Sequence, residues 1–358
     1  MTAALRVIDT GIRDGRKQIA FDQAMIDLHR AGEIPDTVRF LQFETSALVG
    51  RHQAVRRELK LDHCHSNSIR VVRRITGGGA IYLDPGQLGW ELLISRKRFP
   101  MPTFEAYSRA ICEAVASGLS KSFGIDARFR PRNDIEVGGR KICGTGGFFD
   151  GDTLFFQGTL LVDADPSRIA ACLNVPESKL KKRGIDRVGH RVTNLKTLLG
   201  GQTPGIASIK AAIQSGIADG FGLELFDDVP SQSEEGLADE LFAEEIGTDE
   251  FVYSIDDPSG AGIYEAELTA PGGTVTAYVR LEGDHAARRV RELLLAGDFF
   301  VTPTRTILDL EASLRGVYVG ILGTAVDRFF TKSKPEMSTI SPSDFRSVIQ
   351  AAVQMAEP

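Results

Sequence analysis

Two glycine-rich segments of this chain carry residue types that bind anionic groups. The first reads RRITGGGAIYLD over residues 73–84 and places Arg74 shortly before Gly77, Gly78 and Gly79. Bare backbone N–H groups beside a guanidinium form a cradle for phosphate or carboxylate oxygens, and glycines let a ligand approach the backbone closely. A flexible glycine turn with solvated arginines explains the same residues, so this segment alone does not decide between the two.

The second segment, NDIEVGGRKICGTGG at residues 133–147, predicts a strand, a tight turn at Gly138 and Gly139, and a returning strand. Lys141 lies in the returning strand, where a lysine can present a point charge to a phosphate or a carboxylate. A lysine in an edge strand can instead serve to discourage aggregation. The combination of the two segments favours an anion-binding site.

The composition is that of a globular protein with room for two domains. The chain has 358 residues, 42% of them hydrophobic and 25% charged, and its net charge of −6 argues against non-specific nucleic-acid binding. We find no signal-peptide-like start and no apolar run of about 18 residues, so we expect a cytoplasmic protein without a membrane span. Four scattered cysteines without CxxC spacing suggest neither a zinc site nor a disulfide framework, namely Cys64, Cys112, Cys143 and Cys172.

The hydrophobic periodicity predicts an α+β fold. Apolar stripes predict one helix through Phe21 and Leu28 and another through Tyr107 and Leu119. Asp165-Pro166 and Thr203-Pro204 look like N-caps followed by proline and predict helices over 167–173 and 205–217. Strands are expected at 4–9, 37–43, 47–49, 69–73, 80–83, 89–94 and 127–129, and in hairpins around Gly138-Gly139 and Asp150-Gly151.

A shift in composition predicts two domains. Residues 228–248 are acidic and polar, which indicates a linker or an exposed connecting helix between a domain at 1–227 and a second at 249–358. In the second domain, the APGG sequence at 270–273 predicts a hairpin over 264–281, and helices are expected at about 284–296, 303–315 and 341–355. This small α+β domain contains no cluster of catalytic type.

Four ordered motifs resemble those of the lipoate–protein ligase A family, in the biotin/lipoate ligase superfamily. The resemblance covers about residues 5–225 and implies a large mixed β-sheet packed with helices, the class II synthetase-like biotin/lipoyl ligase fold. The catalytic domain would then occupy 1–227 and an accessory domain 249–358. The motifs are RRITGGGAIYLD at 73–84, NDIEVGGRKICGTGG at 133–147, QGTLLVDAD at 157–165 and KLKKRGIDRVGHRVTNL at 179–195.

The resemblance implies a two-step reaction. Lipoate and Mg-ATP would form lipoyl-adenylate and pyrophosphate, and the lipoyl group would then pass to a lysine of a carrier protein. The carrier would be a lipoyl domain of an oxo-acid dehydrogenase, the glycine-cleavage H protein or a dedicated lipoate-binding protein. Positioning and charge stabilisation would supply most of the rate, because the protein needs little covalent chemistry of its own. We expect a monomer that binds neither nucleic acid nor membranes.

The same resemblance implies the roles of single residues. Arg74 would neutralise the lipoate carboxylate or the α-phosphate, and Lys141 would bridge the lipoyl carbonyl and the α-phosphate. Asn133 and Asp134 would orient phosphate and Mg²⁺, with Asp134 as the metal ligand, although an Asn-Asp pair is also a common turn signal. The nucleotide would lie along a backbone strip that comprises Gly77, Gly78, Gly79, Ala80, Ile81 and Tyr82. Tyr82 fits an ordinary sheet aromatic equally well.

Several residues keep other functions open. Cys143 supports the main alternative, a transferase of the same fold that carries an octanoyl or lipoyl group as a thioester, although cysteine also behaves as a small hydrophobe. Leu83 and Gln157 stand where many family members carry histidine, and glutamine cannot titrate. A biotin ligase is disfavoured because the chain lacks a GRGRxGR-like loop. A non-enzymatic lipoate-binding module or an inactive partner subunit also remains open.

A basic stretch stands out in this acidic chain. It could clamp phosphates or attract an acidic carrier domain, and a solvated helix face explains its single lysines equally well. The run RVTNL at 191–195 matches the family and favours a structural or site-forming loop. The basic residues are Lys179, Lys181, Lys182, Arg183, Arg187 and Arg191.

Overall fold

The computed structural model describes residues 3–131, 133–174, 192–258, 260–270, 273–284, 287–338 and 340–356. The chain divides into two compact units. The first unit comprises residues 1–48, 59–73 and 81–252, and the second comprises 49–58, 74–80 and 253–358. The chain therefore enters the second unit within the glycine-rich segment at 74–80 as well as after residue 252.

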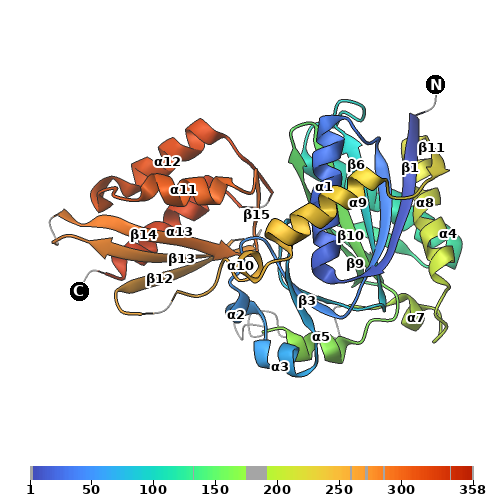
Figure 1. Cartoon of the computed structure of the whole chain (residues 1–358), viewed down its shortest axis with the longest axis horizontal. Coiled ribbons are helices and arrows are strands. Elements are labelled where there is room, and N and C mark those ends of the chain that lie inside the picture. Colours follow the sequence, from blue (N-terminus) through green and yellow to red (C-terminus); the bar gives the residue numbers. More distant parts are fainter. Residues whose placement is uncertain are drawn as a thin grey trace. The chain divides into compact units, whose positions relative to one another are not determined.

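A mixed sheet forms the centre of the first unit (Figure 1). Among the described residues it has eight strands in the order β11-β1-β2-β6-β10-β9-β8-β7, with β1 parallel to β11 and to β2 and the other neighbours antiparallel. This confirms the predicted mixed sheet and both predicted hairpins. The strands are β1 (Ala3–Arg13), β2 (Thr37–Phe43), β6 (Gln87–Ser95), β7 (Ala127–Arg130), β8 (Asp134–Val137), β9 (Arg140–Asp150), β10 (Thr153–Leu161) and β11 (Leu223–Asp227).

Helices cover both faces of this sheet (Figure 1). On one face, α4 (Phe104–Phe123) and α8 (Ile206–Phe221) pack over a core that includes Trp90 and Phe156. The Thr103 side chain caps α4, which buries Tyr107 and Leu119 as predicted. The helix α8 starts after Gly205, two residues later than an N-cap at Thr203 would place it.

A buried ion cluster joins the opposite face of the sheet to α1 (Gly15–Ala31). Arg39 of β2 donates to Asp22 of α1 at 2.6 Å and to Glu91 of β6 at 2.9 Å, and all three side chains are buried. Burial and the adjacent Asp22 charge raise the pKa of Glu91 well above its ordinary value. No local sequence pattern indicates this cluster, because its members lie far apart in the chain.

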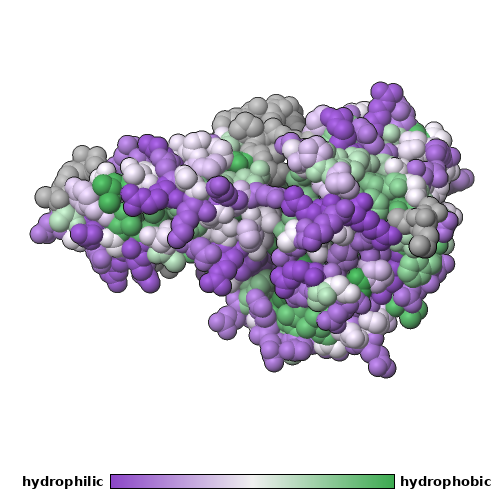
Figure 2. Space-filling view, turned by 90° about the horizontal axis from the view of Figure 1, so that it is seen from above, coloured by the Kyte–Doolittle hydropathy of each residue, from purple (hydrophilic) through white to green (hydrophobic). Residues whose placement is uncertain are grey.

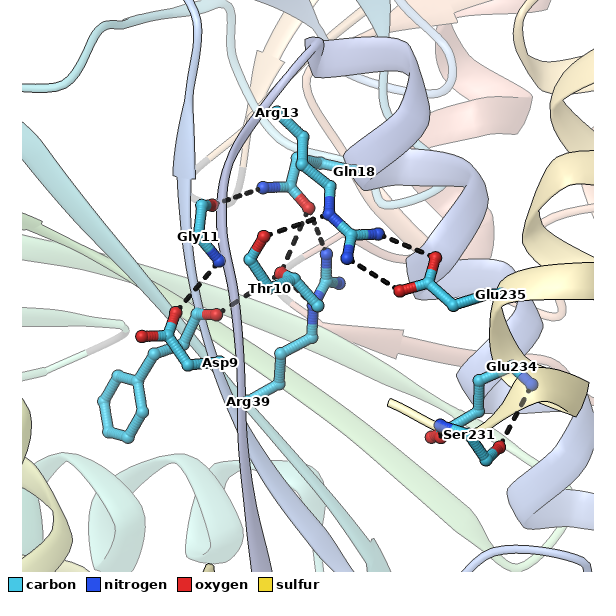
Figure 3. A network of polar contacts seen from close by, with 10 residues as sticks. Asp9, Thr10, Gly11, Arg13, Gln18, Arg39, Ser231, Glu234 and Glu235 are labelled. Atoms are coloured by element: carbon cyan, nitrogen blue, oxygen red, sulfur yellow. Dashed lines mark hydrogen bonds and ion pairs between the residues drawn. The ribbon is translucent and has the colours of Figure 1, made fainter. Parts of the chain in front are cut away.

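The segment 228–248, which the composition predicts to be a linker or an exposed connecting helix, contains helices that pack on α1. They are α9 (Gln232–Leu241) and a π-helical turn (Phe242–Ile246), followed by α10 (Asp249–Val252). Glu234 is buried and pairs with Arg6 of β1. Arg13 donates to both carboxylate oxygens of Glu235 at 2.7 and 2.9 Å (Figure 3). Arginines of β1 thus hold this acidic segment on the first unit.

A smaller sheet of the first unit has the order β4-β3-β5 in the described part of the chain. Its strands are β3 (Ser46–Val49), β4 (Arg70–Arg73) and β5 (Ile81–Leu83). Two short helices, α3 (Leu61–Ser66) and α5 (Pro166–Cys172), lie side by side next to it (Figure 1). Asp165 caps α5 as predicted. The four-residue helix α7 (Leu195–Leu198) follows later in the chain.

The second unit is a small α+β structure with its own core. In its described residues, β12 (Ile263–Ala270), β13 (Gly273–Glu282) and β14 (Arg289–Gly297) form an antiparallel sheet, and β15 (Phe300–Thr302) pairs with β16 (Glu336–Ser338). The predicted hairpin over 264–281 is confirmed. The helices are α2 (Val55–Glu58), α11 (Thr306–Leu314), α12 (Leu322–Ser333) and α13 (Pro342–Gln354), with a 3₁₀ turn at Val319–Ile321.

The predicted helix at 284–296 is wrong, because β14 occupies most of this range. Its alanine and leucine residues favour a helix by intrinsic propensity. Val290 and Leu295 are nevertheless fully buried in the core of the second unit, and β14 pairs along its length with β13. Long-range pairing and burial therefore outweigh local propensity here.

Hydrophilic residues are prominent on the face of the molecule that Figure 2 draws. Figure 2 shows that polar residues cover most of one face, with apolar residues in smaller areas between them. No described helix is long and apolar enough to cross a membrane.

Candidate functional site

The β8–β9 hairpin positions Lys141. Gly138 and Gly139 adopt φ angles of +58° and +75°, as a tight two-residue hairpin turn requires. The backbone around Lys141 is fixed on its other side too, because its carbonyl accepts a hydrogen bond of 2.8 Å from the Thr193 N–H. The Lys141 side chain therefore extends from a strand whose backbone is held on both sides.

A β-bulge decides which way the residues of this hairpin point. Asp134 pairs with Gly144 and Ile135 with Cys143, but Glu136 pairs with Lys141, so that β9 contains one extra residue at this place. Paired residues share a face and neighbouring residues alternate. Lys141 and Gly144 therefore lie on the face of Asp134 and Glu136, and Cys143 lies on the opposite face with Ile135.

The Lys141 side chain lies in a space that Gly144 leaves open. Its Nζ atom is 2.7 Å from Asp134 Oδ1, and its side chain is 35% exposed. A Cβ atom at position 144 would lie 2.5 Å from Nζ and 2.7 Å from Cε, far too close for either atom to stay in place. Gly144 is thus a site residue that the sequence analysis missed, although the glycine after the lysine was visible in the motif.

Asp134 is the acidic centre of the site. Its second oxygen pairs with Arg130, which also lies 3.5 Å from Glu136. The described residues contain no group of three potential ligands for a metal ion. One carboxylate is nevertheless what Mg²⁺ needs when substrate phosphates supply further oxygens. The site thus fits a magnesium–nucleotide complex.

Asn133 stabilises the hairpin through hydrogen bonds. Its side-chain amide donates to the Thr145 carbonyl at 2.5 Å, and the Thr145 hydroxyl and N–H donate to the Asn133 carbonyl at 2.8 and 2.9 Å. These bonds fix the backbone on both sides of Asp134. The predicted role of Asn133 toward phosphate stays a prediction.

The predicted anion strip is split between the two units. Arg74 and residues 77–80 belong to the second unit, and Ile81 and Tyr82 belong to the first. Arg74 is buried and donates to the carbonyls of Gly77 and Gly79 at 3.2 and 2.8 Å. Burial lowers the pKa of Arg74 to about 10.

Two of the three consecutive glycines are needed for packing. A Cβ at Gly77 would lie 2.2 Å from the Phe299 carbonyl oxygen, and a Cβ at Gly78 would lie 2.9 Å from the Phe300 ring. Gly78 also has a φ angle of +94°, which favours glycine. Gly79 is exposed, and the nearest atom to its added Cβ is 4.0 Å away. Of the three, Gly79 therefore offers the most room for a ligand.

Tyr82 is a buried sheet residue with an anchored hydroxyl. It pairs with Ala47 of β3, and its hydroxyl donates to Asp84 at 3.1 Å. Burial raises the pKa of Tyr82 above its ordinary value. Its side chain thus behaves as an ordinary sheet aromatic, and the role of its backbone toward a nucleotide stays a prediction.

The two positions that depart from the family pattern lie in different sheets. Leu83 is buried in β5. Gln157 of β10 pairs with Glu91 of β6 and Gly146 of β9, so that it continues the row of residues that includes the buried ion cluster. The basic residues at 179–191 lie outside the described residues, so their predicted role stays untested.

Cys143 lies in the core. Its side chain is fully buried between the main sheet and α4, and burial raises the pKa of the thiol. A thiol that stays protonated away from solvent is a poor nucleophile. The bulge at Ile142 explains why Cys143 points into the core, because it places Cys143 on the face opposite Lys141.

Comparisons with known proteins identify relatives of this chain. The lipoyl protein ligase A/B catalytic domain family matches residues 14–218. The probable lipoate-protein ligase A of Mycoplasma genitalium is 31% identical over 180 residues, which are 50% of this chain and 52% of that protein. The chain thus aligns with about half the length of this relative. The octanoyltransferase LipM of Halalkalibacterium halodurans is 24% identical over 273 residues, which are 69% of this chain and 97% of that protein.

Solved structures show the same fold. The bipartite lipoate protein ligase of Thermoplasma acidophilum, described together with its E2 lipoyl domain, has a TM-score of 0.62 at 26% identity and covers 72% of this chain and 99% of that one. A lipoate-protein ligase A with bound ATP has a TM-score of 0.60 at 26% identity, and the match covers 71% of this chain and 100% of that one. LipL1 of P. falciparum in complex with lipoate has a TM-score of 0.74 at 14% identity and covers 98% and 99%, which shows a shared fold.

Proposed function

The chain belongs to the lipoyl protein ligase A/B catalytic domain family, and we propose that it is an ATP-dependent lipoate–protein ligase. Its relatives include lipoate ligases and octanoyltransferases. Membership therefore gives the class of reaction, the attachment or transfer of a lipoyl or octanoyl group. The proposal concerns the acyl donor: free lipoate, activated by Mg-ATP, rather than an acyl group taken from another protein.

The placement of Lys141 carries the proposal. Its ammonium group stands on the face of the sheet away from the core, 2.7 Å from Asp134, in the space above Gly144. When the lipoate carboxylate attacks the α-phosphorus of ATP, negative charge accumulates on oxygens around the reacting phosphorus. A fixed cation at that place stabilises the transition state more than the separated substrates, which is what raises the rate.

The chemistry divides into two transfers. In the first, a carboxylate oxygen of lipoate bonds to the α-phosphorus while the bond to the bridging oxygen breaks and pyrophosphate leaves. In the second, the amine of a carrier lysine attacks the carbonyl carbon and AMP leaves. Lys141 would stabilise the first transfer, with Arg74 as a second cation. Mg²⁺ held by Asp134 and the phosphates would neutralise the charge of the leaving pyrophosphate.

The decisive experiment is lipoate-dependent ATP–pyrophosphate exchange by the purified protein with Mg²⁺ and without a carrier. We expect exchange by the wild type and none by Lys141→Ala. The matched control is Lys121→Ala, because Lys121 forms a comparable ion pair of 2.9 Å with Asp219 on the exposed surface of α4 and α8. Normal exchange by a folded Lys141→Ala protein would remove this lysine from the mechanism.

The second candidate function is the cysteine-dependent acyl transferase that the LipM relative suggests. Its nucleophile would have to be reachable, and the Cys143 side chain is fully buried. We therefore expect Cys143→Ser to retain lipoate ligation. Loss of all acyl transfer in a folded Cys143→Ser protein, together with an octanoyl thioester on Cys143 of the wild type, would favour the transferase.

The acceptor is proposed to be a lipoyl carrier domain. The Thermoplasma ligase is described with an E2 lipoyl domain, so such a domain is the first acceptor to test. The glycine-cleavage H protein and a dedicated lipoate-binding protein are the other two carriers that the sequence resemblance implies. Mass spectrometry of each carrier after incubation with enzyme, lipoate and Mg-ATP distinguishes them by the added lipoyl mass.

A further inference from the structure

Cys64 and Cys172 lie in two short helices that are neighbours in the fold. Cys64 lies in the six-residue helix α3, and Cys172 ends the seven-residue helix α5. Both side chains are fully buried. The thiols are close enough for each to affect the pKa of the other. We propose that this pair is a redox-active dithiol, which an oxidant of the peroxide class converts to a disulfide.

The surrounding backbone fixes the pair. The Lys60 N–H donates to the Cys172 carbonyl at 2.8 Å, the Cys64 N–H donates to the Lys60 carbonyl at 3.0 Å, and Leu59 forms an antiparallel bridge with Leu173. One residue, Lys60, therefore connects the two cysteines through the main chain. The two chain segments that carry the cysteines are thus held next to each other by backbone hydrogen bonds, as the formation of a disulfide requires.

Both thiols are protonated while they stay buried. Burial, followed by the charge of Cys172, raises the pKa of Cys64 to about 11. Burial also raises the pKa of Cys172, although the nearby Lys60 charge acts in the opposite direction. Neither thiol is therefore a ready nucleophile until it becomes exposed to solvent.

The oxidation then has a defined order. The thiolate of one cysteine attacks one oxygen of the peroxide, the O–O bond breaks, and a sulfenic acid forms while the other oxygen leaves as water. The thiolate of the other cysteine attacks the sulfenic sulfur, the S–O bond breaks, and a second water leaves. Two thiols and one peroxide thus give one disulfide and two waters. The neighbouring thiol intercepts the sulfenic acid before further oxidation.

Access comes from the weakness of the covering helices. Helices of six and seven residues are not stable by themselves, and most residues of α5 are partly or fully exposed. Local opening of such an element is far less costly than unfolding of the domain. Cys112 and Cys143 provide the contrast, because they are buried in the main core between α4 and β9.

The pair also has a connection to the proposed nucleotide strip. Arg168 of α5 lies 3.5 Å from Asp84, which accepts the hydrogen bond of Tyr82. A disulfide that draws α5 toward α3 disturbs this contact. We therefore expect oxidised protein to bind ATP less tightly than reduced protein. This consequence rests on the proposed function, whereas the disulfide itself does not.

The experiment treats the full-length protein with hydrogen peroxide, alkylates the remaining thiols after denaturation and maps the peptides by mass spectrometry. We expect alkylation to fall from four cysteines, the number in the chain, to two. A linked peptide pair should contain Cys64 and Cys172, and dithiothreitol should reverse the link. Cys143→Ser should still form it, and Cys172→Ser should not.

Three results would overturn the proposal. They are four alkylated cysteines after treatment, a sulfinic acid on Cys64 or Cys172 without a linked peptide, and a link that joins Cys112 to Cys143 instead. These readouts concern wild-type protein, so they hold even if Cys172→Ser fails to fold. They also need no ligase activity. Calorimetric titration with ATP tests the consequence separately: an unchanged Kd in fully linked protein would refute the coupling to the nucleotide strip.

Discussion

Gly144→Ala is a sharp test of how the site holds Lys141. The new Cβ would lie 2.5 Å from Nζ, whereas ordinary van der Waals contact begins at 3.4 Å. The ammonium group must therefore move by the difference, 3.4 minus 2.5, or about 0.9 Å. The atoms in the way are the far end of a flexible side chain, so the lysine can swing aside without disturbing the backbone.

The expected result is a large loss of activity with little loss of stability. A displacement of about 1 Å at a reacting centre lowers the rate by about 100-fold, equivalent to about 2.7 kcal/mol. The ion pair with Asp134 is partly exposed, so its loss contributes little to the free energy of unfolding. Urea denaturation should thus give a nearly unchanged midpoint, while kcat for lipoate-dependent ATP–pyrophosphate exchange falls.

The matched control is Gly236→Ala. Gly236 lies exposed inside α9, and nothing lies within 4 Å of an added Cβ. This change should leave exchange unaltered and stabilise the protein by up to about 1 kcal/mol, because alanine favours a helix over glycine. Wild-type exchange by folded Gly144→Ala protein, with Lys141→Ala inactive, would refute the argument that Gly144 positions the lysine. If both variants were active, the lysine itself would be excluded.

Two further predictions concern stability. Burial raises the pKa of Glu311 to about 7 from 4.5, despite its hydrogen bond from the Leu295 N–H. Because the folded state keeps this proton longer than the unfolded state, the free energy of unfolding should fall as pH rises from about 4.5 to about 7, by at most about 3 kcal/mol. Glu311→Gln, which accepts the same bond without titrating, should remove that slope in urea titrations across this range; an equal slope in the variant would contradict the assignment. Glu234→Gln should lower the free energy of unfolding of the first unit by about 3 kcal/mol, because it leaves the buried Arg6 without its main carboxylate partner. This value is near the lower end of the range for a broken buried ion pair, since Arg6 still has Asp228 at 3.6 Å. A denaturation midpoint equal to that of the wild type would show that Arg6 and Glu234 do not hold α9.

Much of the first unit was predictable because its signals are local. The stripe through Tyr107 and Leu119, the cap at Asp165 and the glycines at 138 and 139 each act within a few residues. Helix periodicity, capping and turn chemistry are properties of short segments, so the chain shows them without its fold. Lys141 is likewise part of a motif visible in the sequence, and its role in the site stays a prediction.

Local sequence patterns are insufficient where residues far apart in the chain determine the structure. The helix expected at 284–296 is the strand β14, because β13 pairs with it. The acidic segment, expected to be a linker or an exposed connecting helix, contains the helix α9, and Arg6 and Arg13 of β1 hold it by neutralising two of its carboxylates. Neither partner is near in sequence, so no local pattern reports it.

The sequence by itself determined the residue types of the candidate site and the family to which the chain belongs. Tertiary structure decided their arrangement. One extra residue in β9 places Lys141 and Gly144 on the face of Asp134 and turns Cys143 into the core. The tertiary fold also brings the helix of Cys64 next to that of Cys172 across more than a hundred residues of chain. The reason is that side-chain direction and contact depend on strand register and packing, which only the folded chain defines.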